Sequence, residues 1–279
     1  MALLTISRHK GCHGIEIAQM VAKELELELY DDARLRQEAL QMGLKAEELK
    51  GFDTEAPGFF DRIMRADPQL YLDLMASVIY EVAKRCHGVI IGHGSQKLLR
   101  SFDSALHVHI YGTMKKRIQR MMDEQGLSAE TAEKLITKSD NKRKSYIRYT
   151  FHEDWDNPKL YDLIINRDKM LPETAAGIIV QAARSDEISS CGINASESME
   201  KLSLIKKVEA EIIRNDFNLN LLHVEAPEQG VVKIWGYIVN LWGYTQAEGE
   251  LDRFKRIVQA VPGVREAQYD VAMMNTEGE

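Results

Sequence analysis

The sequence predicts an α/β fold, in which helices flank a parallel β-sheet, with a small α+β domain after it. Residues 2–7 form a short apolar run typical of a buried strand. A loop containing Gly11 and Gly14 leads from this run into apolar residues at helical spacing, which is how a parallel α/β unit begins. Further buried-strand runs follow at residues 88–92, 106–111 and 163–165.

A change of pattern predicts where the α/β body ends. Residues 185–199 are small and polar without apolar periodicity, which is typical of a linker. After it, the pattern predicts helix, strand, strand, helix and strand, with Glu228-Gln-Gly230 as a hairpin turn. We therefore expect a body over residues 1–184, a linker over 185–199 and a second domain over 200–279.

Composition restricts the class of protein. The chain has 279 residues, of which 44% are hydrophobic and 28% are charged, which is ordinary for a globular protein with a sizeable core. The net charge of −7 argues against a nucleic-acid-binding protein that coats its ligand with a basic surface. We expect no transmembrane segment, because no run approaches the roughly 20 apolar residues that a membrane helix needs.

The three cysteines, Cys12, Cys86 and Cys191, are far apart, and no pair has the spacing of metal ligands. This pattern predicts three reduced thiols in a cytoplasmic protein. The N-terminal apolar run is too short for a secretory signal, and its charged residues follow it rather than precede it. We assign no residue as a metal ligand.

The loop between the first strand and the first helix is a candidate phosphate site. Backbone N–H groups and the positive end of a helix dipole attract anions there. Lys10 borders the loop and is a candidate cation, although a solvated lysine is an equal alternative. Two glycines three residues apart are also compatible with a simple turn from strand to helix.

Positive charge is concentrated over residues 114–148, which hold ten Lys and Arg against five Asp and Glu. The segment is helical in pattern. The alternative to anion binding is an ordinary solvated basic face.

Residues 1–184 contain an ordered set of short motifs. They are Leu4-Thr-Ile-Ser-Arg8, Glu16-Ile-Ala18, Tyr30-Asp31, Glu55-Ala-Pro57, Gly88-Val-Ile-Ile-Gly92, Leu106-His-Val-His-Ile-Tyr111, Asp140-x-x-Arg143-x-x-Tyr146 and Tyr161-Asp-Leu-Ile-Ile-Asn166. With these motifs the segment resembles the cytidylate-kinase-like family of P-loop proteins. The resemblance implies a P-loop NTPase-type sheet, and ATP and Mg²⁺ as cofactors.

The chain departs from the family's pattern at the phosphate site. The family's loop usually reads Gly-Ser-Gly-Gly-Arg-Glu-Ile, whereas residues 11–17 read Gly-Cys-His-Gly-Ile-Glu-Ile. His13 thus stands where backbone approaches phosphate, and Ile15 replaces a cation. His93 stands where relatives tend to carry arginine.

The resemblance also implies roles for individual residues. Those expected to hold the donor phosphates are Lys10, Gly11, Cys12, His13, Gly14, Lys142 and Lys144. Those expected to stabilise the transferring charge are Arg143 and Arg148, and the acceptor would meet Asp31 and His93. On one continuous helix Arg143 and Arg148 point about 140° apart, so they converge only if the helix bends or breaks. Asp31 fits a helix N-cap equally well.

Residues 200–275 resemble a BON domain. The matching residues are Ile205-Lys-Lys-Val208, Gly230-Val-Val-Lys-Ile-Trp-Gly236 and Val261-Pro-Gly-Val264. The resemblance implies a regulatory or interaction module that binds a protein or a small ligand. Trp235 and Tyr237 share one strand face, as core residues or as a recognition patch.

Together these features predict a nucleotide-binding protein that phosphorylates a nucleoside monophosphate, CMP-like, or another small acceptor. The altered loop leaves two alternatives open. One is a kinase-like protein that has lost catalysis and acts as a nucleotide or anion sensor or interaction protein. The other is a structural fusion with a vestigial site.

Overall fold

The structure is a computed structural model that describes residues 2–45, 68–189, 192–240 and 247–275. By its internal contacts the chain divides into two compact units. The first consists of Met1–Arg62 and Arg85–Ser196, and the second of Ile63–Lys84 and Glu197–Glu279. Each unit is described separately below.

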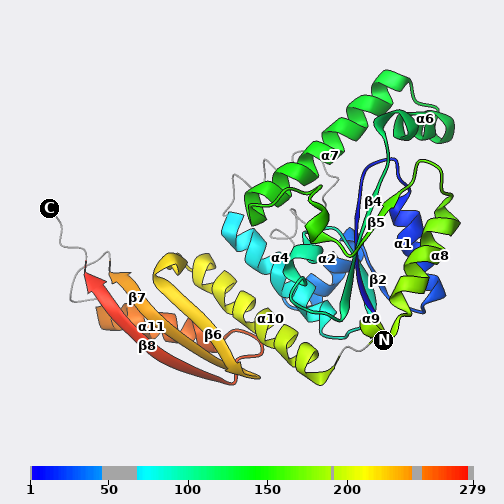
Figure 1. Cartoon of the computed structure of the whole chain (residues 1–279). Helices are drawn as coiled ribbons and strands as arrows, with labels where there is room; N and C mark the ends of the chain where they lie inside the picture. The colour runs from blue at the N-terminus through cyan, green and yellow to red at the C-terminus, as the bar shows by residue number, and fades with distance from the viewer. Residues whose placement is uncertain (1, 46–67, 190–191, 241–246, 276–279) are drawn as a thin grey trace. The chain divides into compact units, whose positions relative to one another are not determined.

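A five-stranded parallel sheet forms the centre of the first unit, as the sequence predicts (Figure 1). Its strands lie in the order β2-β3-β1-β4-β5. They are β1 (Leu3–Arg8), β2 (Leu29–Tyr30), β3 (Gly88–Ile91), β4 (Ala105–Tyr111) and β5 (Leu163–Asn166). Because all are parallel, their carboxyl ends meet at one edge of the sheet, where ligands of open α/β sheets bind.

Helices flank this sheet. The described helices of the first unit include α1 (Gly14–Glu24), α2 (Asp32–Gln41), α5 (Ser95–Leu98), α6 (Met114–Gln125), α7 (Ala129–Phe151), α8 (Pro172–Ala183) and α9 (Asp186–Ser189). Helices α6 and α7 pack on each other in a small apolar cluster of their own. On one face α1 and α8 pack side by side, and their apolar residues join those of the strands in a single core. This packing fixes the start of α1 directly after β1.

The basic segment forms two helices rather than one. Helix α6 ends at Gly126, whose φ of 65° is left-handed and favours glycine. Helix α7 then begins after Ser128, whose hydroxyl accepts a hydrogen bond from the Thr131 N–H at 3.2 Å. From there α7 continues without a break through both Arg143 and Arg148.

The second unit is a three-stranded mixed sheet with helices. Helices α4 (Pro68–Ala83), α10 (Ile193–Arg214) and α11 (Ala247–Gln259) accompany β6 (Leu222–Glu228), β7 (Val231–Asn240) and β8 (Glu266–Asn275). From α10 onward the order of elements is the predicted one. Strands β6 and β7 are antiparallel around the predicted turn, and β8 runs parallel to β7.

Two features of the second unit were not predicted. Helix α4 groups with it, because the Ser203 hydroxyl donates to the Ser77 carbonyl at 3.0 Å and Lys206 pairs with Asp73 at 3.0 Å. In addition, α9 and the start of α10 occupy described parts of the predicted linker. The domain boundaries and the BON assignment stay predictions.

Gly236 is required where β7 passes β6. Its φ is +128°, and a Cβ there would lie 2.1 Å from the Leu221 carbonyl oxygen. The core of the unit lies on the same side of β7, with Ile234 and Ile238 fully buried. Tyr237, by contrast, is 50% exposed and is not a core residue.

The expectation of three reduced thiols was wrong. Cys86 is disulfide-bonded, whereas Cys12 is a buried free thiol. Sequence separation does not show which cysteines a fold brings together, because bonding depends on the distance between their Cα atoms. The cysteine pattern therefore no longer argues for a reducing compartment.

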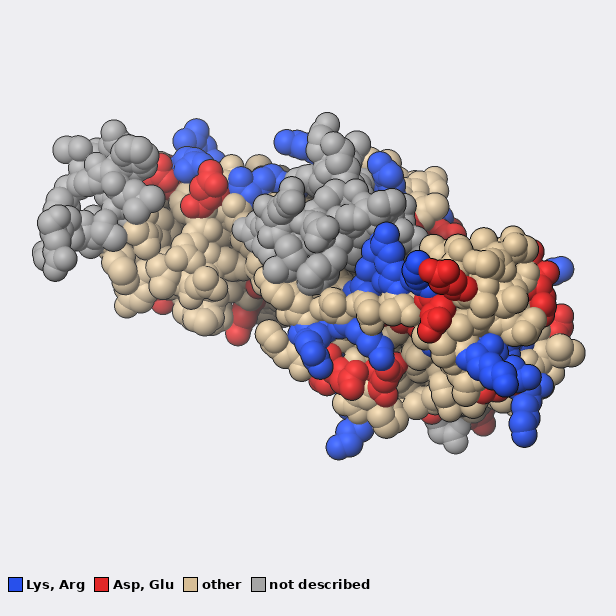
Figure 2. Space-filling model, turned by 90° about the horizontal axis from the view of Figure 1, so that it is seen from above, with Lys and Arg blue, Asp and Glu red and all other residues tan. Residues whose placement is uncertain are grey.

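No helix in the described parts of the chain is long and apolar enough to span a bilayer. On the face shown in Figure 2, Lys and Arg side chains alternate with Asp and Glu. Two features named in the sequence lie outside the described residues, namely Cys191 and the motif at 55–57.

Candidate functional site

The loop between β1 and α1 adopts a conformation suited to anions. Gly11 and His13 both have left-handed backbone, with φ of 79° and 57°. His13 is the N-cap residue of α1, yet its side chain makes no capping hydrogen bond. The N–H groups of the first turn of α1 therefore keep their capacity to bind an anion.

The Arg8 side chain passes beside this helix start. A Cβ on Gly14 would lie 2.4 Å from Arg8 Cβ, and a Cβ on Gly92 would lie 2.8 Å from an Arg8 guanidinium nitrogen. Gly14 therefore has no room for a side chain, and Gly92 has a left-handed φ of 76°, which favours glycine. As a result, a guanidinium lies between the loop after β1 and the loop after β3.

A cavity of about 370 Å³ opens over this loop. Its cationic lining side chains are Arg8, Lys10 and Arg143, and Glu16 and Glu124 supply carboxylates. A second, smaller cavity of about 30 Å³ is lined by Arg8, His93, Lys142, Arg143 and other residues. Arg8 and Arg143 thus line both cavities.

Helix α7 presents one face to both strand-end loops. Asp140 accepts a hydrogen bond from the Lys10 N–H at 3.0 Å, and the Tyr146 hydroxyl donates to the His93 carbonyl at 3.3 Å. Arg143 lies midway between them on the helix, because residues three apart share a face. The Asp140-x-x-Arg143-x-x-Tyr146 motif is thus a device that places Arg143 between the two loops.

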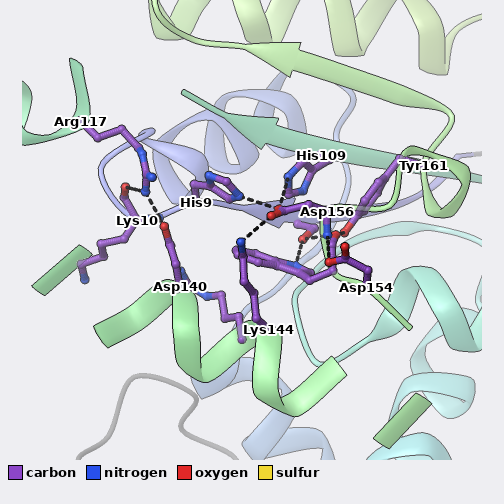
Figure 3. A network of polar contacts seen from close by, with 12 residues as sticks. His9, Lys10, His109, Arg117, Asp140, Lys144, Asp154, Asp156 and Tyr161 are labelled. Atoms are coloured by element: carbon purple, nitrogen blue, oxygen red, sulfur yellow. Dashed lines mark hydrogen bonds and ion pairs between the residues drawn. The ribbon is translucent and has the colours of Figure 1, made fainter. Parts of the chain in front are cut away.

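Arginines that sequence reasoning missed hold the outer side of the loop. Arg117 donates to the Lys10 carbonyl at 3.2 Å and pairs with Asp140 at 2.5 Å (Figure 3). Arg120 donates to the Gly11 carbonyl at 3.4 Å. These two arginines therefore hold the backbone of the loop in place through the carbonyls of Lys10 and Gly11.

His13 is bound on both sides of its ring. Arg167 donates to Nδ1 at 2.6 Å, and Nε2 lies 2.7 Å from a Glu124 carboxylate oxygen. Since arginine only donates, Nδ1 is the acceptor and Nε2 carries the proton given to Glu124. His13 therefore fastens the loop to α6 and to the chain after β5.

Cys12 does not face the cavity. Its side chain is fully buried in the core beneath the loop. Burial raises the pKa of its thiol to about 11, so the thiol is protonated at neutral pH. The structure thus gives Cys12 a packing position, while Lys10, Gly11, His13 and Gly14 line the cavity.

The remaining predicted basic residues of α7 are separated. Lys142 lines the smaller cavity beside Arg143. Lys144 pairs with Asp156 at 2.6 Å, and Arg148 is exposed. Because α7 is unbroken, Arg148 points about 140° away from Arg143 and the two do not converge.

The two predicted acceptor residues differ in their positions. Asp31 is the N-cap of α2 and accepts a hydrogen bond from the Arg34 N–H at 2.9 Å, which is the alternative that the sequence left open. His93 lines the smaller cavity, and its Nε2 lies 2.9 Å from Asp32. His93 therefore remains a candidate for contacting an acceptor.

A second polar group adjoins the loop. The sequence offers His9 as a possible hydrogen-bond donor to phosphate but does not predict its neighbours His109 and Asp156. His9 Nε2 lies 3.0 Å from an Asp156 carboxylate oxygen, and His109 Nε2 lies 3.8 Å from the same oxygen (Figure 3). Hydrogen bonding from His9 holds the pKa of Asp156 far below its usual range. These residues are widely separated in the sequence, which gives no signal that they meet.

The known proteins similar to this chain agree with its fold and its motifs. The model of the cytidylate kinase-like family matches residues 3–169. The chain belongs to this family. The match covers β1 to β5 and ends before α8. Of the second unit it includes α4, whereas α10 to β8 lie outside it.

Two curated proteins are similar to this chain in sequence, and one solved structure is similar to it in fold. A cytidylate kinase from Thermococcus kodakarensis is 25% identical over 201 residues, which is 71% of this chain and 95% of that protein. A cytidylate kinase from Thermoplasma volcanium is 29% identical over 86 residues, or 31% of this chain and 44% of that protein. An uncharacterized protein from Eubacterium ventriosum has the same fold, with a TM-score of 0.52 and 22% identity. Its match covers 65% of this chain and 97% of that protein.

Proposed function

We propose that this member of the cytidylate kinase-like family transfers the γ-phosphoryl group of ATP to a nucleoside monophosphate, CMP-like, or to another small acceptor. The observation that carries the proposal is the position of Arg143. It stands beside Arg8 between the loop after β1 and the loop after β3, so it lines both cavities. Two guanidinium groups at this place suit a reaction whose catalysis is mainly positioning and charge neutralisation.

The larger cavity fits the phosphates of a nucleotide. The first turn of α1 offers N–H groups, and Arg8 and Arg143 offer charge-assisted hydrogen bonds. Arg8 thereby supplies the positive charge that Ile15, which follows the last glycine of the loop, cannot supply. The acceptor would lie on the side of the smaller cavity, near His93 and Lys142.

Glu16 is the residue that would hold magnesium. It lies in the first turn of α1 and lines the cavity, and Mg²⁺ in phosphate sites is held by one or two carboxylates together with phosphate oxygens. When bound, the ion neutralises charge on the phosphates. The P-loop motif uses a Ser or Thr hydroxyl after the lysine, and this chain has the Glu16 carboxylate in that part of the helix.

The test is release of ADP from ATP and Mg²⁺ in the presence of a panel of monophosphates that includes CMP and dCMP. We expect acceptor-dependent ADP that falls by about 100-fold or more in Arg143→Ala, because a charge-stabilising donor is lost from the transition state. The matched control is Lys138→Ala, an exposed residue of the same helix outside both cavities. A rate that survives in Arg143→Ala points to a contaminating kinase and contradicts the proposal.

A second candidate is a nucleotide sensor without turnover. It is favoured by His13, which fastens the loop to Glu124 and Arg167 and puts a side chain where the family usually has glycine. ATP that raises the melting temperature without acceptor-dependent ADP would identify a sensor. Neither a shift nor turnover would identify a vestigial site.

For the second unit we propose an interaction module of the BON type. The order of its elements and its open sheet face support this assignment. On that face the Trp235 ring stacks on His223 with centroids 5.4 Å apart, and Lys233 lies 5.8 Å from the Trp235 centroid. A half-buried tryptophan stacked on the exposed His223 suits recognition of a protein or a small ligand.

A further inference from the structure

Three side chains from distant parts of the first unit converge beside the phosphate loop. His9 comes directly after β1, His109 lies on β4, and Asp156 follows α7. One potential ligand atom from each lies within 4.8 Å of the other two. Figure 3 shows both imidazole rings directed toward the Asp156 carboxylate.

The surroundings hold this group in position without meeting all its hydrogen-bonding needs. The His109 ring stacks on Tyr161 with centroids 4.5 Å apart, and the His9 ring lies 4.8 Å from Trp155. The Nδ1 atoms of both histidines are buried and have no hydrogen-bond partner in the described structure. Both rings turn Nε2 toward the Asp156 carboxylate, so an ion at this place would be bound through the two Nε2 atoms.

We propose that His9, His109 and Asp156 form a binding site for a first-row divalent transition metal, Zn²⁺ being the representative ion. Two imidazole nitrogens and one carboxylate oxygen form a donor set that Zn²⁺ and its neighbours prefer. The same set is unsuited to Mg²⁺, which prefers oxygen ligands. The site is therefore distinct in its chemistry from the magnesium position at Glu16.

The distances match such an ion after small movements. Bonds of 2.0–2.2 Å in tetrahedral geometry separate neighbouring ligand atoms by about 3.3–3.5 Å. The Asp156 oxygen lies 3.0 Å from His9 Nε2 and 3.8 Å from His109 Nε2, on either side of that value, and all three ligand atoms lie within 4.8 Å of one another. Asp156 is 36% exposed, which gives an ion access from solvent and leaves room for water as a fourth ligand.

Lys144 is the expected competitor for this site. Its ammonium lies 2.6 Å from the other Asp156 carboxylate oxygen and adds positive charge next to the ion position. The Lys144 side chain is 47% exposed, so it can turn into solvent when an ion binds. Metal binding would thus break the ion pair between Lys144 of α7 and Asp156. In its place the ion would connect His9, next to the phosphate loop, with His109 of β4.

The experiment is a titration of the full chain with metal alone, after chelator treatment and removal of any affinity tag. Co²⁺ is followed by its visible absorption, and Zn²⁺ by calorimetry. We expect one equivalent to bind, with a loss of affinity of at least about tenfold in both His109→Asn and Asp156→Asn. Lys144→Gln should bind more tightly than the parent, a result that a merely structural cluster does not produce.

The control is His152→Asn, which removes an exposed histidine from the end of α7 and leaves the three ligands in place. Its affinity should equal that of the parent. His109 is buried and its variant can fail to fold, whereas Asp156 is at the surface, so Asp156→Asn with an unchanged circular dichroism spectrum keeps the test valid. Absence of saturable Co²⁺ and Zn²⁺ binding, or equal affinity in parent and Asp156→Asn, overturns the proposal.

Discussion

The loop between β1 and α1 has the cationic side chain of Arg8 at its phosphate cavity. In the P-loop motif a lysine follows the last glycine, on the helix. In this chain Ile15 follows Gly14 and the guanidinium comes from Arg8, the last residue of β1. The loop keeps a cation at the phosphate cavity, but the cation reaches it from the strand.

Among single residues, Glu38 is expected to make the stability of the fold depend on pH. It is 2% exposed and accepts hydrogen bonds from Arg85 at 2.9 and 2.7 Å. The Arg85 hydrogen bonds are the main cause that lowers the pKa of the Glu38 carboxyl. The pair therefore stabilises the fold fully above the unfolded pKa of about 4.3, and this stability is lost as pH falls through the folded pKa.

The change that tests this is Glu38→Gln. At pH 7 we expect the free energy of unfolding in urea to fall by about 1.5–3 kcal/mol, because a charged hydrogen bond is removed. The difference from the parent should shrink as pH is lowered below about 4.3. Glu24→Gln, which breaks an exposed pair with Arg184, should change stability by about 0.5 kcal/mol or less. A difference for Glu38→Gln that stays constant with pH would contradict the prediction.

At the scale of elements, α7 is the part that organises the site. Through Asp140 it holds the loop after β1, and through Tyr146 it holds the loop after β3. Phe151 adds a packing contact, since a Cβ on Gly94 would lie 2.2 Å from its ring. A helix fastened at both loops presents Arg143 to the cavities without needing a bend.

Asp140→Asn tests this role of α7. Asparagine can still accept from the Lys10 N–H, but the buried Arg117 guanidinium loses its ionic partner. We expect the free energy of unfolding to fall by about 3–5 kcal/mol, the usual effect of leaving one buried charge alone. Glu130→Gln breaks an exposed pair on the same helix and should cost about 0.5 kcal/mol or less. Equal losses in the two variants would refute the role given to Asp140.

At the scale of the whole molecule, sequence reasoning found the sheet but only part of the site. Apolar runs reveal strands because burial on both faces leaves a local signature. Arg117, Arg120 and Arg167, which hydrogen-bond to the loop after β1, have no such local sequence signature. Each of them is distant from the loop in the sequence and meets it only in the folded chain. The phasing of Arg143 and Arg148 could be predicted from helix geometry, whereas the Arg8 position depends on packing against two glycines.

Gly236→Ala tests whether the two units unfold separately. The added methyl meets the Leu221 carbonyl, and the φ of +128° strains any residue other than glycine. We expect amide hydrogen exchange to accelerate by tenfold or more in α4, α10 and β6 to β8, and to stay unchanged in β1, β3 and β4. Gly249→Ala in α11, where a Cβ meets nothing within 4 Å, serves as control. Equal acceleration in both units would show that they unfold together.

His13 has a consequence for how this loop can evolve. The left-handed backbone at position 13 would be less strained with glycine. A His13→Gly substitution, however, would remove the ring that contacts both Glu124 and Arg167. A single substitution therefore gains backbone freedom at the expense of two contacts. We expect positions 13, 124 and 167 to covary among relatives, with histidine at the first accompanied by an acid and an arginine, and glycine at the first releasing the other two to drift.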